Sequence, residues 1–430
     1  MKKAKTFQRR GFLEGFYGKP WTDAQRRDMI ALMAGVGGQR AAGGMNVYAY
    51  AAKDDPYHRD EWEKLYPAEA LEQLGSLVEF CRGKGVDFMY CTAPGLTFEY
   101  DNKEHYAALR AKLEQVMDLG VTSFGLFFDD IPKDRQSPED HAAVAKVLYK
   151  AYPGISLTVC PMVYRGTGKE EYIRKLGRAL PKKVDIFWTG SNICSQAITV
   201  EEAKRFKRST GHMPLYWDNY PVNDAEMYHE MHLGPLEGRE AGLYKHCRGI
   251  LFNTMEYFEC TKLPLLTCAD YLRDPENYNP QWSWMEALHT LFGKDALRMV
   301  PFAEQCMTSC LKVQNGPQMM EALEEAAMAY RAGEMLKALG LLSNFYDRME
   351  DCRAFLAESD HPMIPELKKW IKKYNLCCDI FGLAIMQMTG NPVREELEKK
   401  MEEYSESATV LTEFGFRVFV ETALGVGTPG

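Results

Sequence analysis

Two adjacent acids end an apolar run in this chain of 430 residues, where residues 124–128 are followed by Asp129 and Asp130. A buried strand that delivers carboxylates at its C-terminal end is typical of the way a (β/α) barrel presents catalytic groups. Because adjacent strand side chains point to opposite sides, two neighbouring acids can meet two different parts of one substrate. The alternative interpretation is a helix N-cap beside a solvated acid. The rest of the chain favours the catalytic interpretation.

Short apolar or β-rich runs recur through the first 255 residues, separated by segments with helical spacing such as 22–33, 67–84 and 104–119. The runs are 11–17, 45–50, 87–92, 123–128, 156–163, 184–189, 213–219 and 249–253. A spacing of roughly 30 to 40 residues is what strand–loop–helix units require. Eight units predict an α/β fold, a (β/α)8 TIM barrel. The alternative of an open dinucleotide-binding sheet is not supported, because the usual motif of that fold, G-x-G-x-x-G, does not follow the first run.

Long amphipathic patterns replace these units after about residue 256, at 316–342, 341–357, 365–389 and 392–413. Proline and glycine separate them, so we expect an all-α helical domain after the barrel. The predicted domains are a catalytic barrel over 1–260 and a helical bundle over 261–430. The pattern fits a homodimer interface and a ligand-binding groove equally well, because exposed and interface helices look alike in sequence.

Composition narrows the class of protein. The formal net charge of -8 does not suggest a nucleic-acid-binding surface, and no stretch is long and apolar enough for a membrane span. The basic start has no apolar segment behind it, so no secretory signal is expected. The twelve cysteines are scattered and lack a C-x-x-C pair, which indicates reduced core thiols in a cytoplasmic protein rather than disulfides or a zinc site. His229-Glu230-Met231-His232 is not H-E-x-x-H, so neither a metal nor a cofactor is expected.

Polar and aromatic residues cluster at the predicted C-terminal strand ends. They are Glu14-Gly15, Lys53, Asp129-Asp130, Tyr164, Trp188-Thr189, Trp217-Asp218-Asn219 and Asn253. The active sites of barrels lie on this rim. Aromatic faces, carboxylates and amides suit a pyranose, which offers apolar C–H patches and a ring of hydroxyls. We therefore expect a sugar-binding site.

Five motifs, in order along the chain, resemble glycoside hydrolase family 84, a family of β-N-acetylglucosaminidases that includes protein O-GlcNAcases and enzymes once called hyaluronidases. They are EGFYGKPW at 14–21, NVYAYAAKDDPYHR at 46–59, FFDDI at 127–131, WTG at 188–190 and WDN at 217–219. The resemblance covers residues 11 to about 260.

The resemblance implies a retaining exo-β-N-acetylglucosaminidase assisted by the substrate's own acetamido group, which gives an oxazoline intermediate instead of an enzyme adduct. By motif, Asp129 would accept the acetamido N–H and Asp130 would act as general acid and then base. A close like charge and an apolar surround can separate two carboxylate pKa values in this way. The implied substrate-binding residues are Gly15, Lys53, Tyr164, Thr189, Trp217, Asn219, Asp224 and Asn253. The implied partner is a glycan or glycoprotein that bears N-acetylglucosamine.

Alternatives remain both for the roles of single residues and for the function of the whole protein. Lys53 would instead pair with Asp54 or Asp55, Asp224 would cap a helix, and Tyr164, Thr189 and Trp217 would serve packing. For the whole protein, the alternatives are a barrel glycosidase that prefers N-acetylgalactosamine, with Asp224 as the discriminating residue, a non-catalytic sugar-binding barrel, and a metal-dependent hydrolase. The rim has no histidine cluster of the kind a metal-dependent hydrolase uses.

Overall fold

The computed structural model of the chain describes residues 6–35, 44–132, 135, 137–412 and 414–425. The chain divides into two compact units. The first comprises Met1–Asp224, Leu236–Phe258 and Leu265–Ser283, and the second comprises Ala225–Pro235, Glu259–Pro264 and Trp284–Gly430.

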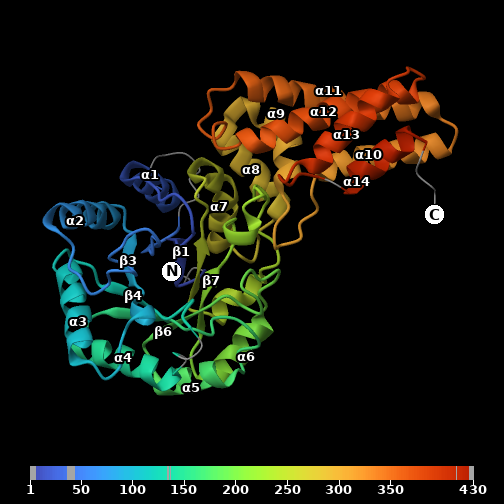
Figure 1. The fold of residues 1–430 in the computed structure, drawn as a ribbon. Coiled ribbons are helices and arrows are strands. Elements are labelled where there is room, and N and C mark those ends of the chain that lie inside the picture. Colours follow the sequence, from blue (N-terminus) through green and yellow to red (C-terminus); the bar gives the residue numbers. More distant parts are fainter. Residues whose placement is uncertain (1–5, 36–43, 133–134, 136, 413, 426–430) are drawn as a thin grey trace. The chain divides into compact units, whose positions relative to one another are not determined.

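Eight parallel strands close into a barrel in the first unit, in the order of the sequence (Figure 1). They are β1 (Arg9–Glu14), β2 (Val47–Tyr50), β3 (Asp87–Thr92), β4 (Ser123–Phe127), β5 (Ser156–Cys160), β6 (Asp185–Trp188), β7 (Pro214–Asp218) and β8 (Gly249–Asn253). Strand β8 pairs with β1, with Leu251 opposite Gly11, and so closes the barrel. The predicted (β/α)8 barrel is confirmed.

Helices surround the strands (Figure 1). They are α1 (Asp23–Ala34), α2 (Ala68–Gly83), α3 (Lys103–Met117), α4 (Pro138–Ala151), α5 (Glu171–Ala179), α6 (Val200–Thr210) and, after β8, α7 (Phe258–Arg273). Capping boxes fix the first residues of two of them, with Thr22 and Gln25 at α1 and Thr199 and Glu202 at α6. The connection from β7 to β8 departs from the repeat, because it contains the short 3-10 helices η3 (Ala225–Met227) and η4 (Ala241–Lys245).

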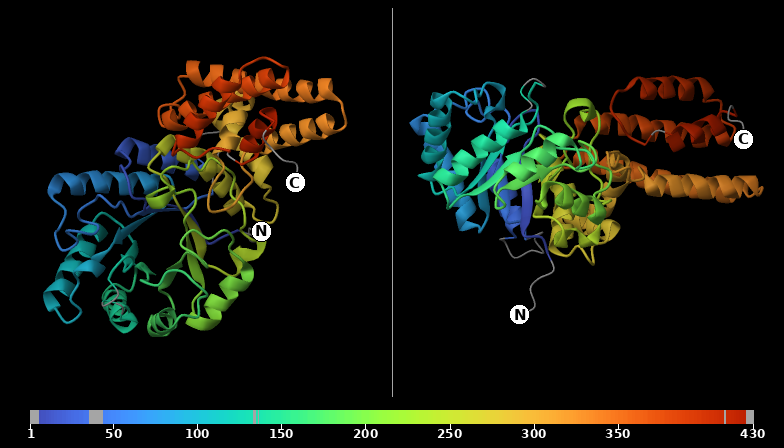
Figure 2. Two further views of the ribbon diagram at one scale, coloured as in Figure 1. Left: turned by 45° about the vertical axis from the view of Figure 1, so that its right-hand side comes forward. Right: turned by 90° about the horizontal axis from the view of Figure 1, so that it is seen from below.

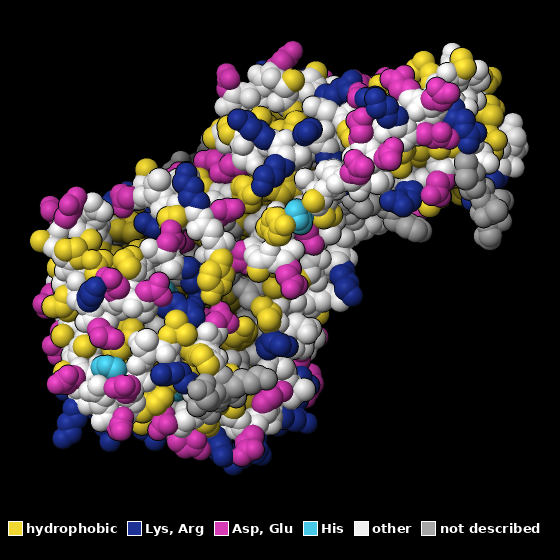
Figure 3. Space-filling model, in the orientation of Figure 1, with side chains coloured by type: hydrophobic (Ala, Val, Ile, Leu, Met, Phe, Trp, Pro, Cys, Tyr) yellow, Lys and Arg dark blue, Asp and Glu magenta, His cyan; other side chains and the backbone are white. Residues whose placement is uncertain are grey.

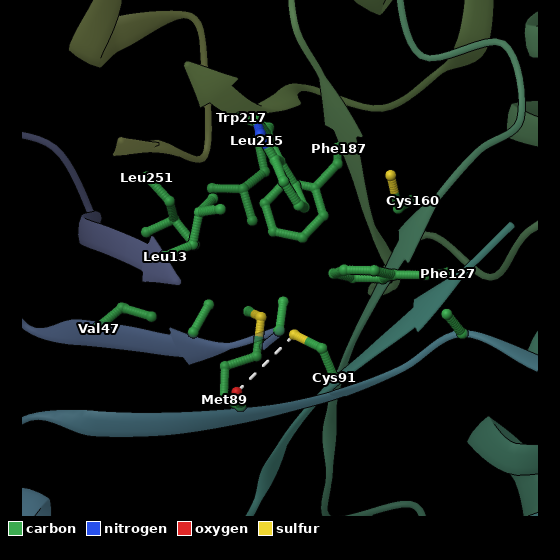
Figure 4. Close-up of a cluster of buried hydrophobic side chains, with 13 residues drawn as sticks. Leu13, Val47, Met89, Cys91, Phe127, Cys160, Phe187, Leu215, Trp217 and Leu251 are labelled. Carbon is green, nitrogen blue, oxygen red and sulfur yellow. Dashed lines mark hydrogen bonds between the residues drawn. The ribbon is translucent and has the colours of Figure 1, made fainter. Parts of the chain in front are cut away.

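The interior of the barrel is filled by side chains from successive strands. Leu13, Phe127, Phe187, Leu215, Trp217 and Leu251 belong to one buried cluster (Figure 4). The Trp217 ring meets the rings of Phe127 and Phe187 at centroid distances of 5.6 and 5.5 Å. A packed interior of this kind is a core rather than a pore, so substrate chemistry is confined to the rim.

The second unit is helical, which confirms the predicted helical region. Its helices include α9 (Ala296–Ala303), α10 (Pro317–Arg331), α11 (Met335–Glu358), α12 (Lys368–Met388), α13 (Arg394–Glu406) and α14 (Phe414–Ala423); α8 (Pro280–Phe292) leads into them. The single amphipathic pattern expected over 316–342 is wrong. Two helices, α10 and α11, lie side by side there (Figure 2), because Gly333 adopts a φ of 79° that ends α10 and reverses the chain.

Surface charge, helix hydropathy and the state of the cysteines bear on whether the protein has nucleic-acid, membrane or disulfide-linked partners. Acidic and basic side chains are interspersed over the face shown in Figure 3, and neither sign dominates it. Within the part of the chain that the structure describes, no helix has both the length and the apolar content that a bilayer crossing demands. Core cysteines such as Cys91 and Cys160 carry free thiols.

Candidate active site

All ten predicted site residues lie in the barrel unit, at or just beyond the C-terminal ends of strands. Gly15 follows β1, Lys53 follows β2, the two acids follow β4, Tyr164 follows β5 and Thr189 follows β6. Trp217 lies on β7, Asn219 and Asp224 follow β7, and Asn253 ends β8. Because the strands are parallel and closed, these ends meet on a single rim. Hydrogen bonds and one ion pair join most of the ten residues to one another or to their neighbours on the rim.

Asp129 and Asp130 occupy the turn just beyond β4. Asp129 is only 8% exposed, whereas Asp130 is exposed. Asp130 has a φ of 51°, a left-handed conformation that aspartate adopts more readily than most non-glycine residues. The turn therefore gives the two carboxylates different surroundings, one buried and one open to solvent.

Asp129 is held by one ion pair and keeps one oxygen unbonded. Its Oδ2 lies 3.5 Å from the Nζ of Lys53, and both side chains are almost fully buried. Its Oδ1 is buried and has no hydrogen-bond partner among the described residues. A buried acceptor without a donor is costly, so this oxygen is suited to receive an N–H from a ligand.

Lys53 pairs with Asp129 rather than with either neighbouring acid. Burial alone would lower the pKa of its ammonium group, but nearby anions, chiefly Asp129, outweigh that effect, so the pKa of Lys53 is raised above its usual value. The carboxylate of Asp55 is occupied elsewhere, because it accepts hydrogen bonds from the hydroxyls of Tyr50 and Tyr66. Lys53 is therefore a fixed cation beside the buried carboxylate.

Two tyrosine hydroxyls donate to the carboxylate of Asp130. Tyr164 reaches Oδ1 at 3.3 Å and Tyr17 reaches Oδ2 at 3.1 Å. Burial, followed by the charge of Asp130, raises the pKa of Tyr164, so its hydroxyl stays protonated and remains a donor. Tyr164 thus contacts the second acid of the pair.

Thr189 is buried, and its hydroxyl is engaged with the backbone. Its Oγ1 donates to the carbonyl oxygen of Asn192 at 2.6 Å and lies 3.3 Å from that of Tyr164, while its N–H donates to the Tyr164 carbonyl at 2.8 Å. In this structure Thr189 fixes the segment that carries Tyr164. These contacts favour the packing interpretation of Thr189, and direct contact with a sugar stays a prediction.

A chain of hydrogen bonds joins β1, β8 and β7 at the rim. The N–H of Gly15 donates to Asn253 Oδ1 at 3.2 Å, and Asn253 Nδ2 donates to Asn219 Oδ1 at 3.0 Å. The same Asn219 oxygen accepts the Trp217 Nε1–H at 2.8 Å. A Cβ on Gly15 would lie 2.7 Å from Cζ2 of Trp217, so only glycine lets this ring lie where it does. The two amides and the ring form one fixed wall.

Asp224 connects to the rim through Tyr17. Its Oδ2 accepts the backbone N–H of Tyr17 at 2.8 Å. Burial raises the pKa of Asp224, and this hydrogen bond opposes the shift. The following residue, Ala225, also has a positive φ of 51°. Asp224 is not the N-cap of a long helix, since only η3 (Ala225–Met227) follows it.

Sequence reasoning did not single out Tyr17 or Arg59. Both stand inside the motifs 14–21 and 46–59, and in the structure both lie on loops, Tyr17 after β1 and Arg59 well into the loop after β2. By contrast, Glu14 does end a strand and serves the fold. It is 1% exposed, pairs with Arg26 at 2.7 Å and accepts the Tyr48 hydroxyl at 2.6 Å. A polar residue at a strand end is therefore not always part of the site.

No metal centre is evident in the described part of the chain, where no three His, Cys, Asp or Glu side chains gather as ligands would. Within the 229–232 sequence, His232 Nε2 lies 2.7 Å from Glu230 Oε2. The absence of a cofactor stays a prediction.

A closed parallel barrel with paired acids, amides and aromatic rings on its C-terminal rim is the arrangement expected of a glycoside hydrolase. The sequence model of the β-N-acetylglucosaminidase family matches residues 10–304. The chain thus belongs to that family, glycoside hydrolase family 84, as the motifs predicted.

Comparison with individual proteins agrees with membership of this family. The chain is 32% identical over 284 residues to the Protein O-GlcNAcase of Rattus norvegicus and equally to that of Mus musculus, covering 62% of this chain and 30% of each relative. It therefore spans less than a third of the length of these curated relatives. Among solved structures, a mutant of the O-GlcNAc hydrolase of Thermobaculum terrenum is 31% identical and superposes with a TM-score of 0.87, covering 97% of this chain and 94% of that chain.

Proposed function

We propose that this protein is a retaining exo-β-N-acetylglucosaminidase that uses the substrate's acetamido group as nucleophile and passes through an oxazoline. The observation that carries the proposal is the state of Asp129. Its carboxylate is buried, held by Lys53 on one oxygen, and has no hydrogen-bond partner among the described residues on the other. An amide N–H at this point would satisfy the second oxygen, and an N-acetyl sugar supplies one.

In the first step Asp129 accepts the acetamido N–H and orients that group. The acetamido oxygen attacks the anomeric carbon while Asp130 gives its proton to the glycosidic oxygen, the bond to the aglycone breaks, and an oxazoline forms in its N-protonated (oxazolinium) state, with the N–H still held by Asp129. Positive charge develops on the acetamido group in this step, and the Asp129 carboxylate stabilises it. Lys53 would hold Asp129 as an anion throughout the reaction.

In the second step Asp130 acts as general base. It removes a proton from water, the water oxygen bonds to the anomeric carbon, and the bond from that carbon to the acetamido oxygen breaks. Two inversions at one carbon give net retention. The exposure of Asp130 supports this role, because both the leaving group and the water must reach it. Tyr17 and Tyr164 hold its carboxylate in place.

The remaining rim residues would bind the sugar. Asn219 and Asn253, fixed by their mutual hydrogen bond, and the Trp217 ring would form one wall of the sugar pocket. Asp224 would accept a sugar hydroxyl, and we propose that it selects N-acetylglucosamine over N-acetylgalactosamine. A site built to pair a hydroxyl rejects an epimer strongly, because the epimer leaves buried polar groups unpaired.

The test is hydrolysis of an aryl β-N-acetylglucosaminide and of its fluoroacetyl analogues. Fluorine makes the acyl oxygen a poorer nucleophile, so we expect the rate to fall steeply from acetyl to trifluoroacetyl. Asp129→Asn and Asp130→Asn should each lose about 10²- to 10⁴-fold in kcat. Asp118→Asn, an exposed acid between the end of α3 and the start of β4, at the opposite end of the barrel from the rim, is the matched control.

Each outcome has a distinct meaning. Turnover that is insensitive to fluorine would point to an enzyme nucleophile and remove the proposed role of Asp129. Equal turnover of the N-acetylgalactosamine substrate would overturn the proposed selection by Asp224. The natural substrate that we propose is a glycan or glycoprotein with terminal β-linked N-acetylglucosamine. A cytoplasmic location and a homodimer through the helical unit stay predictions.

A further inference from the structure

Arg59 extends from the loop after β2 towards the second acid of the site. Its Nη2 donates to the backbone carbonyl of Asp130 at 3.2 Å, and its Nη1 lies 3.4 Å from the hydroxyl of Tyr17. That hydroxyl in turn donates to Asp130 Oδ2. The guanidinium group is therefore only two hydrogen bonds away from the carboxylate that is proposed to protonate the leaving group.

The partners of Arg59 are neutral. Among the described residues its guanidinium makes no ion pair, and both of its hydrogen-bond partners are uncharged oxygens. The other cation at this place, Lys53, is neutralised by Asp129. Arg59 is therefore a positive charge that contacts no anion among the described residues.

The position of Arg59 suits contact with the aglycone rather than with the sugar. A general acid contacts the glycosidic oxygen, so groups beside Asp130 on its solvent side face whatever is attached to that oxygen. Tyr17 lies in the same place, with its side chain 49% exposed. A partly exposed ring next to an unpaired guanidinium suits an aglycone that has an apolar body and a planar anion, because a guanidinium binds a carboxylate through two parallel hydrogen bonds.

We propose that Arg59, with Tyr17 beside it, selects substrates whose aglycone bears a carboxylate close to the glycosidic oxygen. The inference rests on the proposed function, because it assumes that Asp130 protonates the leaving oxygen. Arg59 thus sets preference among aglycones, and the sugar-binding residues do not determine that preference.

The experiment compares two aryl β-N-acetylglucosaminides, a 3-carboxyphenyl and a 3-carbamoylphenyl glycoside, on wild type, Arg59→Gln and Arg59→Lys. The measured quantity is the ratio of the two kcat/KM values for each enzyme. Because the same two substrates are used throughout, their intrinsic difference in leaving ability cancels when the ratios of two enzymes are compared. We expect Arg59→Gln to lower the ratio about 5-fold and Arg59→Lys to lower it less.

Controls separate this effect from a general loss of activity. Arg178→Gln, at an exposed position on α5, should leave the ratio unchanged. In wild type the ratio should fall as ionic strength rises, which tests the charge without any substitution. A ratio that neither salt nor Arg59→Gln changes would overturn the inference. Failure of wild type to hydrolyse either glycoside would instead overturn the proposed function.

A second arm distinguishes the sources of the carboxylate. N-acetylglucosamine is linked either to the serine of a short peptide with an adjacent aspartate or to a sugar acid, each compared with its amide. The pair whose ratio depends on Arg59 identifies the aglycone. Independence from Arg59 in both pairs, together with a positive aryl result, would contradict selection of natural aglycones by this residue.

Discussion

At the scale of single residues, Gly15 leaves no room for a side chain beside the Trp217 ring. A Cβ at Gly15 would approach Trp217 Cζ2 to 2.7 Å and Leu13 Cδ1 to 2.6 Å. We expect Gly15→Ala to displace the ring, to destabilise the fold by about 1–3 kcal/mol through overpacking, and to lower kcat/KM about 10-fold or more. Chemical denaturation and steady-state kinetics measure the two effects. Gly83→Ala is the control, because a Cβ there meets nothing within 4 Å, and activity should be unchanged.

Site residues at the ends of strands could be predicted from the sequence, because the C-terminal ends of all strands of a (β/α)8 barrel lie on one rim, whatever the loops do. Lys53 was predicted from its motif, but its partner was not, since the pairing with Asp129 depends on how the loop after β2 folds. The contacts of Tyr17 and Arg59 with Asp130 were not predicted for the same reason, because both residues lie on loops. The engagement of the Thr189 hydroxyl by backbone carbonyls also has no sequence signal, because any threonine can make such bonds.

At the scale of elements, the N-terminus of α10 depends on a buried acid. Glu304 is fully buried and accepts the N–H groups of Gln318 and Met319. Burial nevertheless raises the pKa of Glu304 to about 7. A raised pKa means that the folded state holds this proton more tightly than the unfolded state does. The contribution to stability is therefore complete below the ordinary value of 4.5 and is lost as the pH rises through about 7.

We therefore expect the free energy of unfolding of the wild type to fall between pH 5 and pH 8 more than that of Glu304→Gln, by on the order of 2–3 kcal/mol. Urea denaturation at both pH values measures this difference. Glu325→Gln, an exposed acid on the same helix, is the control and should follow the wild type. If Glu304→Gln showed the wild-type pH dependence, the carboxyl would be ionised throughout that range.

The strands were the most predictable elements. Strands β3 and β8 have the predicted bounds, and the other six lie within the predicted runs or differ by a few residues at their ends, because apolar composition marks a buried strand but not its last hydrogen bond. The break between α10 and α11 was missed because the amphipathic period continues across Gly333, and only its φ of 79° reveals the turn. The 3-10 connection before β8 gave no periodic signal.

At the scale of the whole molecule, the two compact units share the chain in several pieces. Residues Ala225–Pro235 belong to the helical unit although they lie between two barrel strands. Within that unit, the carbonyl of His229 accepts hydrogen bonds from Trp370 Nε1 at 3.2 Å and Val410 N at 3.0 Å. Leu233 N donates to the carbonyl of Cys306 at 2.8 Å. This connection is therefore held by residues distant in sequence.

We expect a chain that ends at Ser283 to express poorly or aggregate, because it keeps 225–235 and removes the residues that satisfy its polar groups. Soluble yield and circular dichroism measure the effect, and a chain that ends at Gly425 serves as the control. A well-folded and active fragment 1–283 would show that the barrel unit needs none of these contacts.

The division of the helical unit into three stretches of chain also limits how genes of this family can recombine. A single crossover near residue 284 would import a new helical segment while leaving 225–235 and 259–264 from the original parent. The resulting hybrid would join non-matching surfaces inside one helical core. Viable hybrids between distant relatives should therefore be those in which all three stretches come from the same parent.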